Sequence, residues 1–176
     1  MSVYTGKGDK GFSSTSNGDN LPKAALVFEA LGLMDEFQAA LAFVFLDAAV
    51  KLSGKDRGLL RSCNTALFSI NGYIAGCSDL DSAYLLTLVT QMEEQMDALE
   101  ESLPEITGFV EPGESAFACW LNLSRVKCRT AERSLVKLFK TAESFDESAK
   151  SVLKFMNRFS DYLFMLMRAA SCDTPD

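Results

Sequence analysis

The sequence of 176 residues contains no histidine. Without one, the protein cannot use a histidine general base, a Ser-His-Asp or Cys-His grouping, or a histidine-ligated zinc ion. The same absence argues against a ferritin-like di-metal bundle, whose helices carry Glu-x-x-His motifs. The chemistry of an active site must therefore come from other side chains, from the backbone or from the ligands.

Paired cysteine motifs are also missing. The five cysteines, at positions 63, 77, 119, 128 and 172, form no CxxC pair, and four of them lie in apolar segments with helical spacing. We expect reduced thiols in the core of a cytoplasmic protein, in preference to disulfides or a zinc site.

Long apolar runs and basic clusters are absent as well. No run approaches the roughly 18 apolar residues of a membrane span, and residues 1–6 do not resemble the start of a signal peptide. The chain carries 17 Lys and Arg against 24 Asp and Glu, a net charge of −7, without a basic cluster of the kind that binds nucleic acid. We expect neither a membrane nor a nucleic acid as partner.

What the sequence does contain is a strong helical pattern. Apolar residues recur at three- and four-residue spacings in five segments, at about 23–44, 60–74, 85–103, 117–138 and 152–169. Breaks are expected at 53–56, at Gly76, and after Pro104, while residues 79–82 are expected to cap the third helix. This pattern predicts an all-α, five-helix up-and-down bundle that forms one domain over residues 1–176.

The first 22 residues have a different composition. They hold four of the 11 glycines, a Ser/Thr cluster at 13–16 and Pro22, which predicts a loop. The backbone N–H groups of a glycine-rich loop can bind one anion together, and Lys7 or Lys10 can add charge. The GxxxxGK[ST] spacing of a P-loop is absent. The alternative is a solvated N-terminus without a ligand.

The fourth helical segment carries a charged face. Arg125, Arg129 and Glu132 share this face by steps of four and three. An arginine pair can bind phosphate groups in a bidentate manner. The alternative is a solvated face of ion pairs.

The fifth segment has polar residues inside an apolar stretch. Asn157, Asp161 and Arg168 share one face, and they need partners if they are buried. They form either part of a binding site or a structural polar network. In the first segment, Asp35 either faces solvent or pairs with an arginine such as Arg125. These residues predict a phosphate-containing ligand but no particular reaction.

Taken in order, these motifs resemble those of the PduO-type ATP:cob(I)alamin adenosyltransferases, the corrinoid adenosyltransferase family, over nearly the whole chain. The matching segments are Tyr4-Thr5-Gly6-Lys7-Gly8-Asp9-Lys10-Gly11, Lys23, Glu29-Ala30-Leu31-Gly32-Leu33-Met34-Asp35-Glu36, Phe109-Val110-Glu111-Pro112-Gly113, Arg125 with Arg129 and Glu132-Arg133, and Asn157-Arg158-Phe159-Ser160-Asp161-Tyr162-Leu163-Phe164.

The chain departs from the family pattern at several positions. Phe12-Ser13 stands where the family has Thr-Thr, Ala24 follows the lysine where aspartate is usual, Val27 replaces a frequent arginine, and Glu114 replaces a glycine. These departures keep open a second hypothesis, a catalytically weak or inactive member that binds corrinoid or nucleotide as a carrier or regulator.

The resemblance implies both an assembly and a reaction. The expected assembly is a homotrimer with active sites between subunits, with residues 1–22 as the nucleotide-binding loop and 23–170 as the bundle. The expected reaction transfers the 5′-deoxyadenosyl group of ATP to cob(I)alamin, through a four-coordinate cob(II)alamin intermediate, and releases triphosphate. Mg²⁺ is expected mainly through the ATP phosphates, and a cobalamin reductase or an adenosylcobalamin-dependent enzyme is a candidate partner.

The resemblance also assigns residues. It implies that Arg129 stabilises the leaving triphosphate, that Glu132 and Asn157 hold the nucleoside, and that Phe109 lies under the corrin, where it displaces the lower ligand. An Asp35–Arg125 pair is implied across the subunit interface. The remaining binding residues are Thr5, Gly6, Gly8, Asp9, Lys10, Gly11, Lys23, Arg133 and Asp161.

Overall fold

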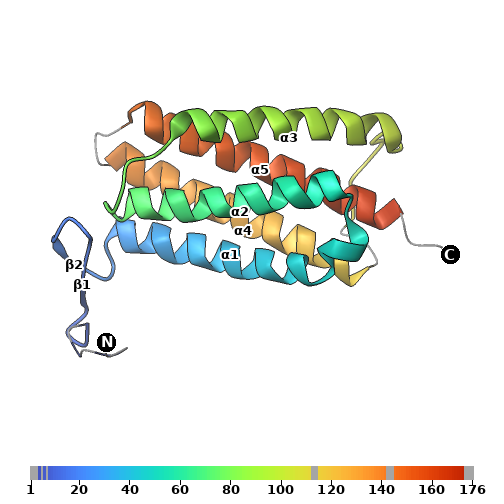
Figure 1. Cartoon of the computed structure of the whole chain (residues 1–176). Helices are drawn as coiled ribbons and strands as arrows, with labels where there is room; N and C mark the ends of the chain where they lie inside the picture. Colours follow the sequence, from blue (N-terminus) through green and yellow to red (C-terminus); the bar gives the residue numbers. More distant parts are fainter. Residues whose placement is uncertain (1–3, 5, 7, 112–114, 142–144, 173–176) are drawn as a thin grey trace.

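The computed structural model describes residues 4, 6, 8–111, 115–141 and 145–172. It is a bundle of five long helices with a small antiparallel sheet at one end (Figure 1). The elements are β1 (Phe12–Ser14), β2 (Asn20–Pro22), α1 (Leu26–Lys51), α2 (Gly54–Ile74), α3 (Ser82–Ser102), α4 (Ala116–Thr141) and α5 (Glu147–Cys172). The expected all-α five-helix fold is confirmed.

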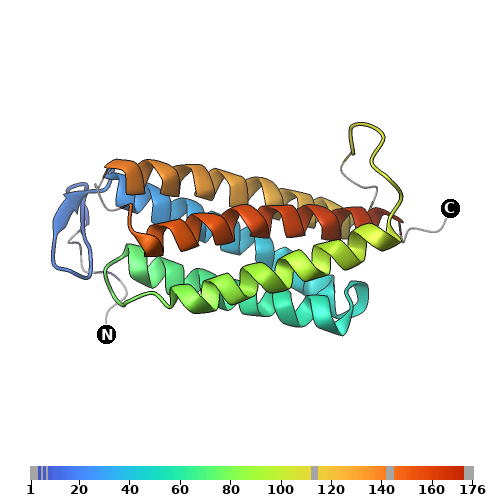
Figure 2. The same cartoon turned by 90° about the horizontal axis from the view of Figure 1, so that it is seen from above.

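The helices form a closed ring around one core. The extensive contacts run from α1 to α4, from α4 to α5 and from α5 to α3, while α2 completes the ring between α1 and α3. Each helix runs opposite to the one before it, so the topology is up-and-down (Figure 1). The β1–β2 hairpin therefore lies at one end of the bundle, and the α3–α4 loop lies at the other (Figure 2).

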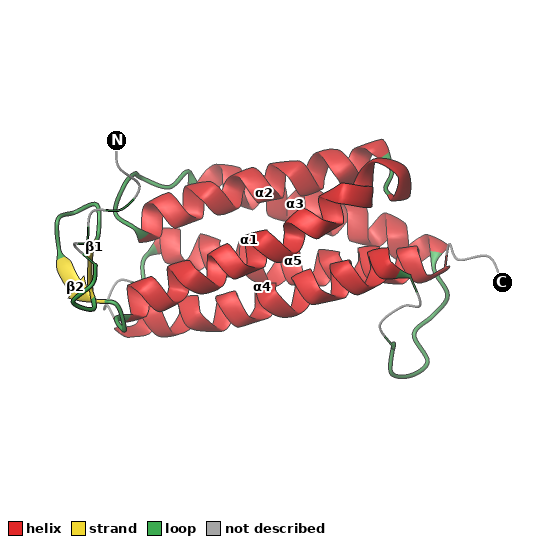
Figure 3. Ribbon diagram, turned by 90° about the horizontal axis from the view of Figure 1, so that it is seen from below, coloured by secondary structure: helices red, strands yellow, loops and turns green. Residues whose placement is uncertain are grey.

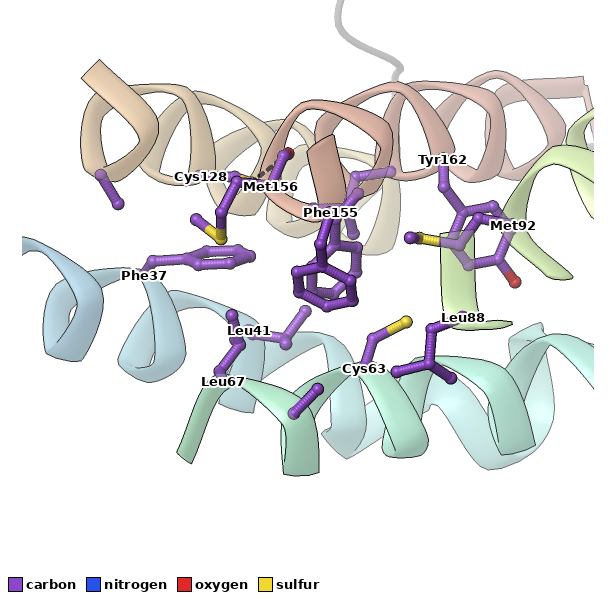
Figure 4. Close-up of a cluster of buried hydrophobic side chains, with 14 of the residues drawn as sticks. Phe37, Leu41, Cys63, Leu67, Leu88, Met92, Cys128, Phe155, Met156 and Tyr162 are labelled. Atoms are coloured by element: carbon purple, nitrogen blue, oxygen red, sulfur yellow. Dashed lines mark hydrogen bonds between the residues drawn. The ribbon is translucent and has the colours of Figure 1, made fainter. Parts of the chain in front are cut away.

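The core is aromatic at its centre (Figure 4). The ring of Phe159 lies between Phe37, at 5.4 Å and edge-on, and Phe155, at 5.6 Å. The Cys128 thiol donates to the carbonyl oxygen of Met156 at 3.3 Å. Such side chains pack without voids, and the apolar area they remove from water contributes about 25 cal/mol per Å².

The cysteine expectation is only partly correct. None of the five cysteines forms a disulfide, but only Cys63 and Cys128 are buried, whereas Cys77, Cys119 and Cys172 are exposed. The exposed three lie at helix ends or on the outward side of a helix, where an apolar neighbourhood in the sequence does not place a side chain in the core.

Helix ends follow local chemistry. Gly76, with φ +74°, lies just after the end of α2, and Asp81 caps α3, which ends at Ser102 before Pro104. The break expected at 53–56 is shorter than predicted. Ser53 caps α2 directly through its side chain, so the helix begins at Gly54.

Within the loop expected at residues 1–22, residues 12–22 form a short hairpin that the sequence did not predict. β1 and β2 pair in antiparallel register, with Ser13 opposite Leu21. Their turn contains Gly18 at φ +89° and is closed by a hydrogen bond from the Thr15 N–H to the Asp19 carbonyl, 3.0 Å. Strands of three residues are too short to show an alternating pattern in the sequence.

Candidate functional site

The glycine loop and Lys23 lie together. The Lys23 N–H donates to the carbonyl of Gly11 at 2.8 Å, and the Gly11 N–H donates to the carbonyl of Gly8 at 3.2 Å. The lysine side chain then lies over Gly8, because a Cβ on that residue would be only 3.0 Å from Lys23 Nζ. A side chain at position 8 would therefore push against the lysine, whose ammonium group lies beside the loop.

An open hollow of about 810 Å³ lies against this loop. Backbone, hydroxyl, amide and ammonium groups line it, and Phe12 supplies an aromatic wall. The lining residues are Gly6, Gly8, Lys10, Phe12, Ser13, Ser14 and Asn20. Donors and one cation around a hollow suit a chain of phosphates. The Asp9 carboxylate lies nearby, since a Cβ on Gly6 would be 3.5 Å from it, and Thr5 lies outside the described residues.

The hairpin turn is docked on the end of α2. The Ser16 N–H donates to the carbonyl of Ala75 at 3.0 Å, and the Ser16 hydroxyl lies 2.7 Å from the Cys77 sulfur. Asn17 packs against Gly76 so closely that a Cβ there would be 2.5 Å from Asn17 Nδ2. The bundle thus fixes the position of the glycine loop. The sequence predicted Gly76 as a helix end but gave no sign of its contact with Asn17.

Two family motifs meet where α4 packs against α5, and we call the surface line between these helices at Glu132 and Asn157 the α4/α5 groove. The Asn157 amide donates to Glu132 Oε1 at 3.4 Å. Arg158 forms ion pairs with Asp161, at 3.1 Å, and with Glu93 of α3, at 2.8 Å. Asp161 therefore holds Arg158 in place, which supports the interpretation of a polar network for this residue.

The arginines of α4 differ in their surroundings. Arg125 is half-buried, donates twice to Asn122 Oδ1 at 3.0 and 2.9 Å, and lies 6.0 Å from the centre of the Phe164 ring. Arg133 donates to Thr130 at 3.1 Å. Arg129 is exposed and makes no hydrogen bond or ion pair within the described part of the chain, so its guanidinium is available to a ligand.

Asp35 and Arg125 do not pair within the chain. Asp35 is exposed on α1 and accepts from Asn71 of α2 at 3.4 Å, whereas Arg125 leans toward α5. The solvent-facing alternative for Asp35 is therefore correct for a single chain. An ion pair between Lys127 and Glu36, 2.6 Å, joins α4 to α1 instead.

Phe109 lies in the loop between α3 and α4, far from the hairpin. Its side chain is 93% exposed. The loop projects from the end of the bundle that also carries the end of α5 (Figure 2 and Figure 3). The neighbouring Pro112 and Gly113 lie outside the described residues. The expected site residues that the structure describes are thus in four places: the hairpin, α4 with its groove beside α5, this loop and, for Asp35, the side of α1 that faces α2.

Burial decides the state of two thiols. Desolvation raises the pKa of Cys63, and it raises the pKa of Cys128 well above its ordinary value, with Glu132 adding to the effect. Both remain protonated and are poor nucleophiles. Within the described residues, no three Cys, Asp or Glu side chains are grouped so that they could hold a metal ion. The helices described here are each too short or too polar to cross a membrane.

Comparison with known proteins identifies relatives over the whole domain. The family model for cobalamin adenosyltransferase matches residues 3–170. The human corrinoid adenosyltransferase MMAB is 34% identical over 96% of this chain and 68% of its own. The corrinoid adenosyltransferase of Bacillus subtilis is 30% identical over 97% of this chain and 87% of its own.

Solved structures show the same fold. A variant of the PduO-type ATP:corrinoid adenosyltransferase from Lactobacillus reuteri, complexed with cobalamin and ATP, superposes with a TM-score of 0.78 at 24% identity. The match covers 97% of this chain and 94% of that one. From the match over residues 3–170 and from these relatives, we conclude that the chain belongs to the cobalamin adenosyltransferase family.

Proposed function

We propose that the protein transfers the 5′-deoxyadenosyl group of ATP to cob(I)alamin, producing adenosylcobalamin and triphosphate. Family membership over residues 3–170 supports this activity. The observation that carries the proposal is the placement of Lys23 beside Gly8, which adds a cation to a loop that has free space for a polyphosphate.

The reaction requires no covalent bond to the protein. The electron pair of cobalt(I) attacks the 5′ carbon and forms the cobalt–carbon bond. The bond from that carbon to the triphosphate oxygen breaks, and its electron pair leaves with triphosphate. The substrate is the nucleophile. A chain without histidine and with protonated buried thiols can serve this reaction by binding, orienting and excluding water.

The cationic groups act on the phosphates. Lys23 and Lys10 bind the triphosphate at the hairpin, and Arg129 stabilises the charge that develops as it leaves. The described residues fit a Mg²⁺ ion held chiefly by ATP phosphates, because they offer no cage of three side-chain ligands. Asp9 is the carboxylate of the glycine loop that can reach such an ion or its waters.

Glu132 and Asn157 bind the nucleoside. Their mutual hydrogen bond is long, 3.4 Å, and both groups lie at the surface of the groove. Hydroxyl and amine groups of a nucleoside can replace this weak contact with stronger hydrogen bonds.

The complete site needs two chains. The hairpin is docked on α2, which packs against α1 and α3 and lies away from the α4/α5 groove. Phe109 is at the opposite end of the bundle, and α4 with its 26 residues is about 39 Å long at 1.5 Å per residue. That length is several times the span of a triphosphate, so the hairpin and Phe109 of one chain cannot act on the same pair of substrates, and the hairpin of one chain acts with the groove and Phe109 of another.

An exposed apolar patch on α1 and α4 suits contact between copies. Phe43 stacks on Trp120, with ring centres 4.5 Å apart, and large exposed side chains continue the patch at Leu46, Leu123 and Val126. Such patches mark interaction surfaces in proteins. They support a homotrimer, in which Asp35 and Arg125, unpaired with each other in one chain, pair between neighbours.

Phe109 acts on the lower face of the corrin. Its apolar ring cannot coordinate cobalt, but it can occupy the space of the lower ligand and exclude water. Loss of that ligand gives four-coordinate cob(II)alamin, which accepts an electron more easily. The exposure of the ring in a single chain fits a residue whose partner is a ligand.

The carrier hypothesis remains the alternative function. Its support is Phe12 in the wall of the phosphate hollow and Ala24 beside Lys23, where the family has polar residues. A carrier would bind ATP or corrinoid without forming adenosylcobalamin or triphosphate.

One assay separates the two functions. Chemically reduced cobalamin, Mg²⁺ and ATP are mixed with the protein, the adenosylcobalamin spectrum is followed, and triphosphate is quantified. Equal amounts of both products support the transferase. Tight ATP binding without either product supports the carrier.

The proposal extends to the setting of the reaction. Five cysteines that form no disulfide support a reducing compartment such as the cytoplasm. There, residues 1–22 would be the nucleotide-binding part of the domain and 23–170 the bundle. A reductase that supplies electrons, or an enzyme that consumes adenosylcobalamin, is the protein partner that this chemistry requires.

A further inference from the structure

Arg168, in the last turns of α5, is a charged side chain that the function described so far does not use. It is only 8% exposed. One guanidinium nitrogen donates to the carbonyl of Pro104, and another contacts the Met165 sulfur at 3.5 Å. Within the described residues it forms no ion pair.

Burying a guanidinium without a carboxylate partner is costly, so its contacts must offset the loss of water. The chief contact is to a main-chain oxygen just beyond the end of α3. Cations are favoured there, because the last carbonyls of a helix carry partial negative charge. Arg168 therefore stabilises the end of α3 and the start of the loop that follows.

That loop has few other attachments. For residues 104–111, the bond from Arg168 to Pro104 is the single hydrogen bond found within the described part of the chain. Val110 is half-buried against the core, whereas Phe109 points into solvent. One hydrogen bond thus fixes one end of a segment whose functional side chain has no packing of its own.

Arg168 also lies directly beneath the loop. It lines a hollow of about 240 Å³ together with Phe109 and its neighbours, and a second hollow of about 390 Å³ with Leu103 and Pro104. Because Arg168 lines both hollows, its side chain lies beside the loop and contacts it directly at Pro104.

We propose that Arg168 is a positioning residue, which holds the 104–111 loop so that the Phe109 ring occupies the lower face of the corrin. This inference rests on the proposed function. It predicts that loss of Arg168 damages the step that depends on Phe109 and spares nucleotide binding at the distant hairpin.

The test replaces the guanidinium without leaving a cavity. Arg168→Met keeps an unbranched, buried side chain, and such replacements are often tolerated. The rate starting from Co(II) and reductant should fall about tenfold, which corresponds to the free energy of one lost hydrogen bond. The rate from pre-reduced Co(I) should change less than about twofold. The four-coordinate Co(II) signal in electron paramagnetic resonance should fall with the first rate.

Three comparisons make the test specific. In a Phe109→Ala background, Arg168→Met should have no further effect on the Co(II) rate, because both changes act through the same ring. Arg61→Met removes an exposed arginine of α2 and should leave both rates unchanged. If Arg168→Met does not fold, Arg168→Lys replaces it in the test. This variant keeps the charge but loses the planar guanidinium, so it should show the same pattern of rates to a smaller degree.

Hydrogen exchange separates this inference from the proposed function. Amides in the last turn of α3, up to Leu103, whose N–H donates to the Leu99 carbonyl at 3.1 Å, should exchange faster in Arg168→Met than in the wild type, whether or not adenosylcobalamin is formed. Unchanged exchange overturns the inference, as does faster exchange with an unchanged ratio of the Co(II) and Co(I) rates. A wild-type protein that makes no adenosylcobalamin from Co(I) overturns the proposed function instead.

Discussion

At the scale of the residue, Arg129 shows how a surface side chain differs from a structural one. Its neighbours Arg125 and Arg133 each donate to a side chain on their own helix, whereas Arg129 extends from α4 without such a bond in the described part of the chain. The spacing of the motif could not distinguish them. Hydrogen-bond partners do distinguish them, and the lack of one supports the proposed role of Arg129 as the cation for the leaving triphosphate.

Arg129→Ala should therefore slow the chemical step. Removal of one preorganised donor from a developing anion lowers the rate by about 10²–10³-fold. Single-turnover measurements with pre-reduced cobalamin and excess enzyme give that rate directly. Lys137→Ala, which removes an exposed cation two turns further along α4, serves as the matched control. Wild-type kinetics for Arg129→Ala would remove this residue from the mechanism.

Tyr162 belongs to the closing family motif but acts in the core. Its hydroxyl donates to Asp56 Oδ1 at 2.8 Å, which links α5 to the start of α2. Burial raises the pKa of this phenol, and the nearby Asp56 charge and the hydrogen bond raise it further. The motif therefore combines ligand-binding residues with one that only stabilises the fold.

The protein should lose stability in alkaline solution. The folded state keeps protons on Tyr162, Cys63 and Cys128 that the unfolded state releases, with ordinary pKa values of about 10 for Tyr and 8.5 for Cys. Stability is full below these values, and it falls as pH rises above them. The expected slope is about 1.4 kcal/mol per pH unit for each group.

Urea unfolding of the reduced protein at pH 7, 9 and 10.5 measures this dependence. Tyr162→Phe should lower stability at pH 7 by about 1.5–3 kcal/mol, because it removes a hydrogen bond to a charged group. It should also make the loss above pH 10 less steep. An equal slope in both proteins would show that the phenol ionises normally in the folded state.

At the scale of the element, the five helices were predictable and the hairpin was not. Apolar spacing and helix-end signals such as Asp81 and Pro104 are local, so they placed all five helices, with ends that differ from the structure by up to seven residues. The pairing of Ser13 with Leu21, and the docking of Asn17 on Gly76, depend on contacts between distant residues. No local pattern encodes such contacts, which is why the support of the phosphate loop became visible only in the structure.

The docked turn offers a sharp test of that support. Gly76→Asn introduces a residue that tolerates positive φ, but its Cβ would lie 2.5 Å from Asn17 Nδ2. The hairpin should be displaced, and the Kd for ATP should rise by about tenfold or more, since small misplacements of binding groups are costly. Titration calorimetry measures this, while circular dichroism should show an intact bundle.

Two further variants separate contact from backbone strain. Gly18→Asn makes the same substitution at another glycine of positive φ, one with nothing within 4 Å of a new Cβ, and should bind ATP normally. Asn17→Gly removes the obstructing side chain, so the double variant with Gly76→Asn should regain most of the affinity. If the double variant binds no better than Gly76→Asn alone, the turn is not what positions the loop.

At the scale of the whole molecule, the hairpin with Lys23 and the loop with Phe109 lie at opposite ends of the bundle (Figure 2). One chain cannot bring both to the same pair of substrates, which supports the proposed site between two chains. The sequence was enough to identify Lys23 and Phe109 as candidate site residues. It could not show their separation, because that depends on helix length and ring order.

Mixed assemblies test the shared site directly. Lys23→Ala disables the hairpin and Asn157→Ala disables the groove, so each variant alone should be nearly inactive. Co-expressed in equal amounts, they should recover about a quarter of wild-type activity, because in a head-to-tail ring one site in four then receives two intact halves. No recovery in trimers shown to contain both variants would place the whole site within one chain.

The same separation has a genetic consequence. A chain defective in both hairpin and groove would contribute a faulty half to two sites of any ring that it enters, which silences about two thirds of them. A cell that makes such a chain beside the normal one would lose more activity than half. Alleles that damage only stability, so that the chain never assembles, would leave the normal copies untouched and behave as recessive.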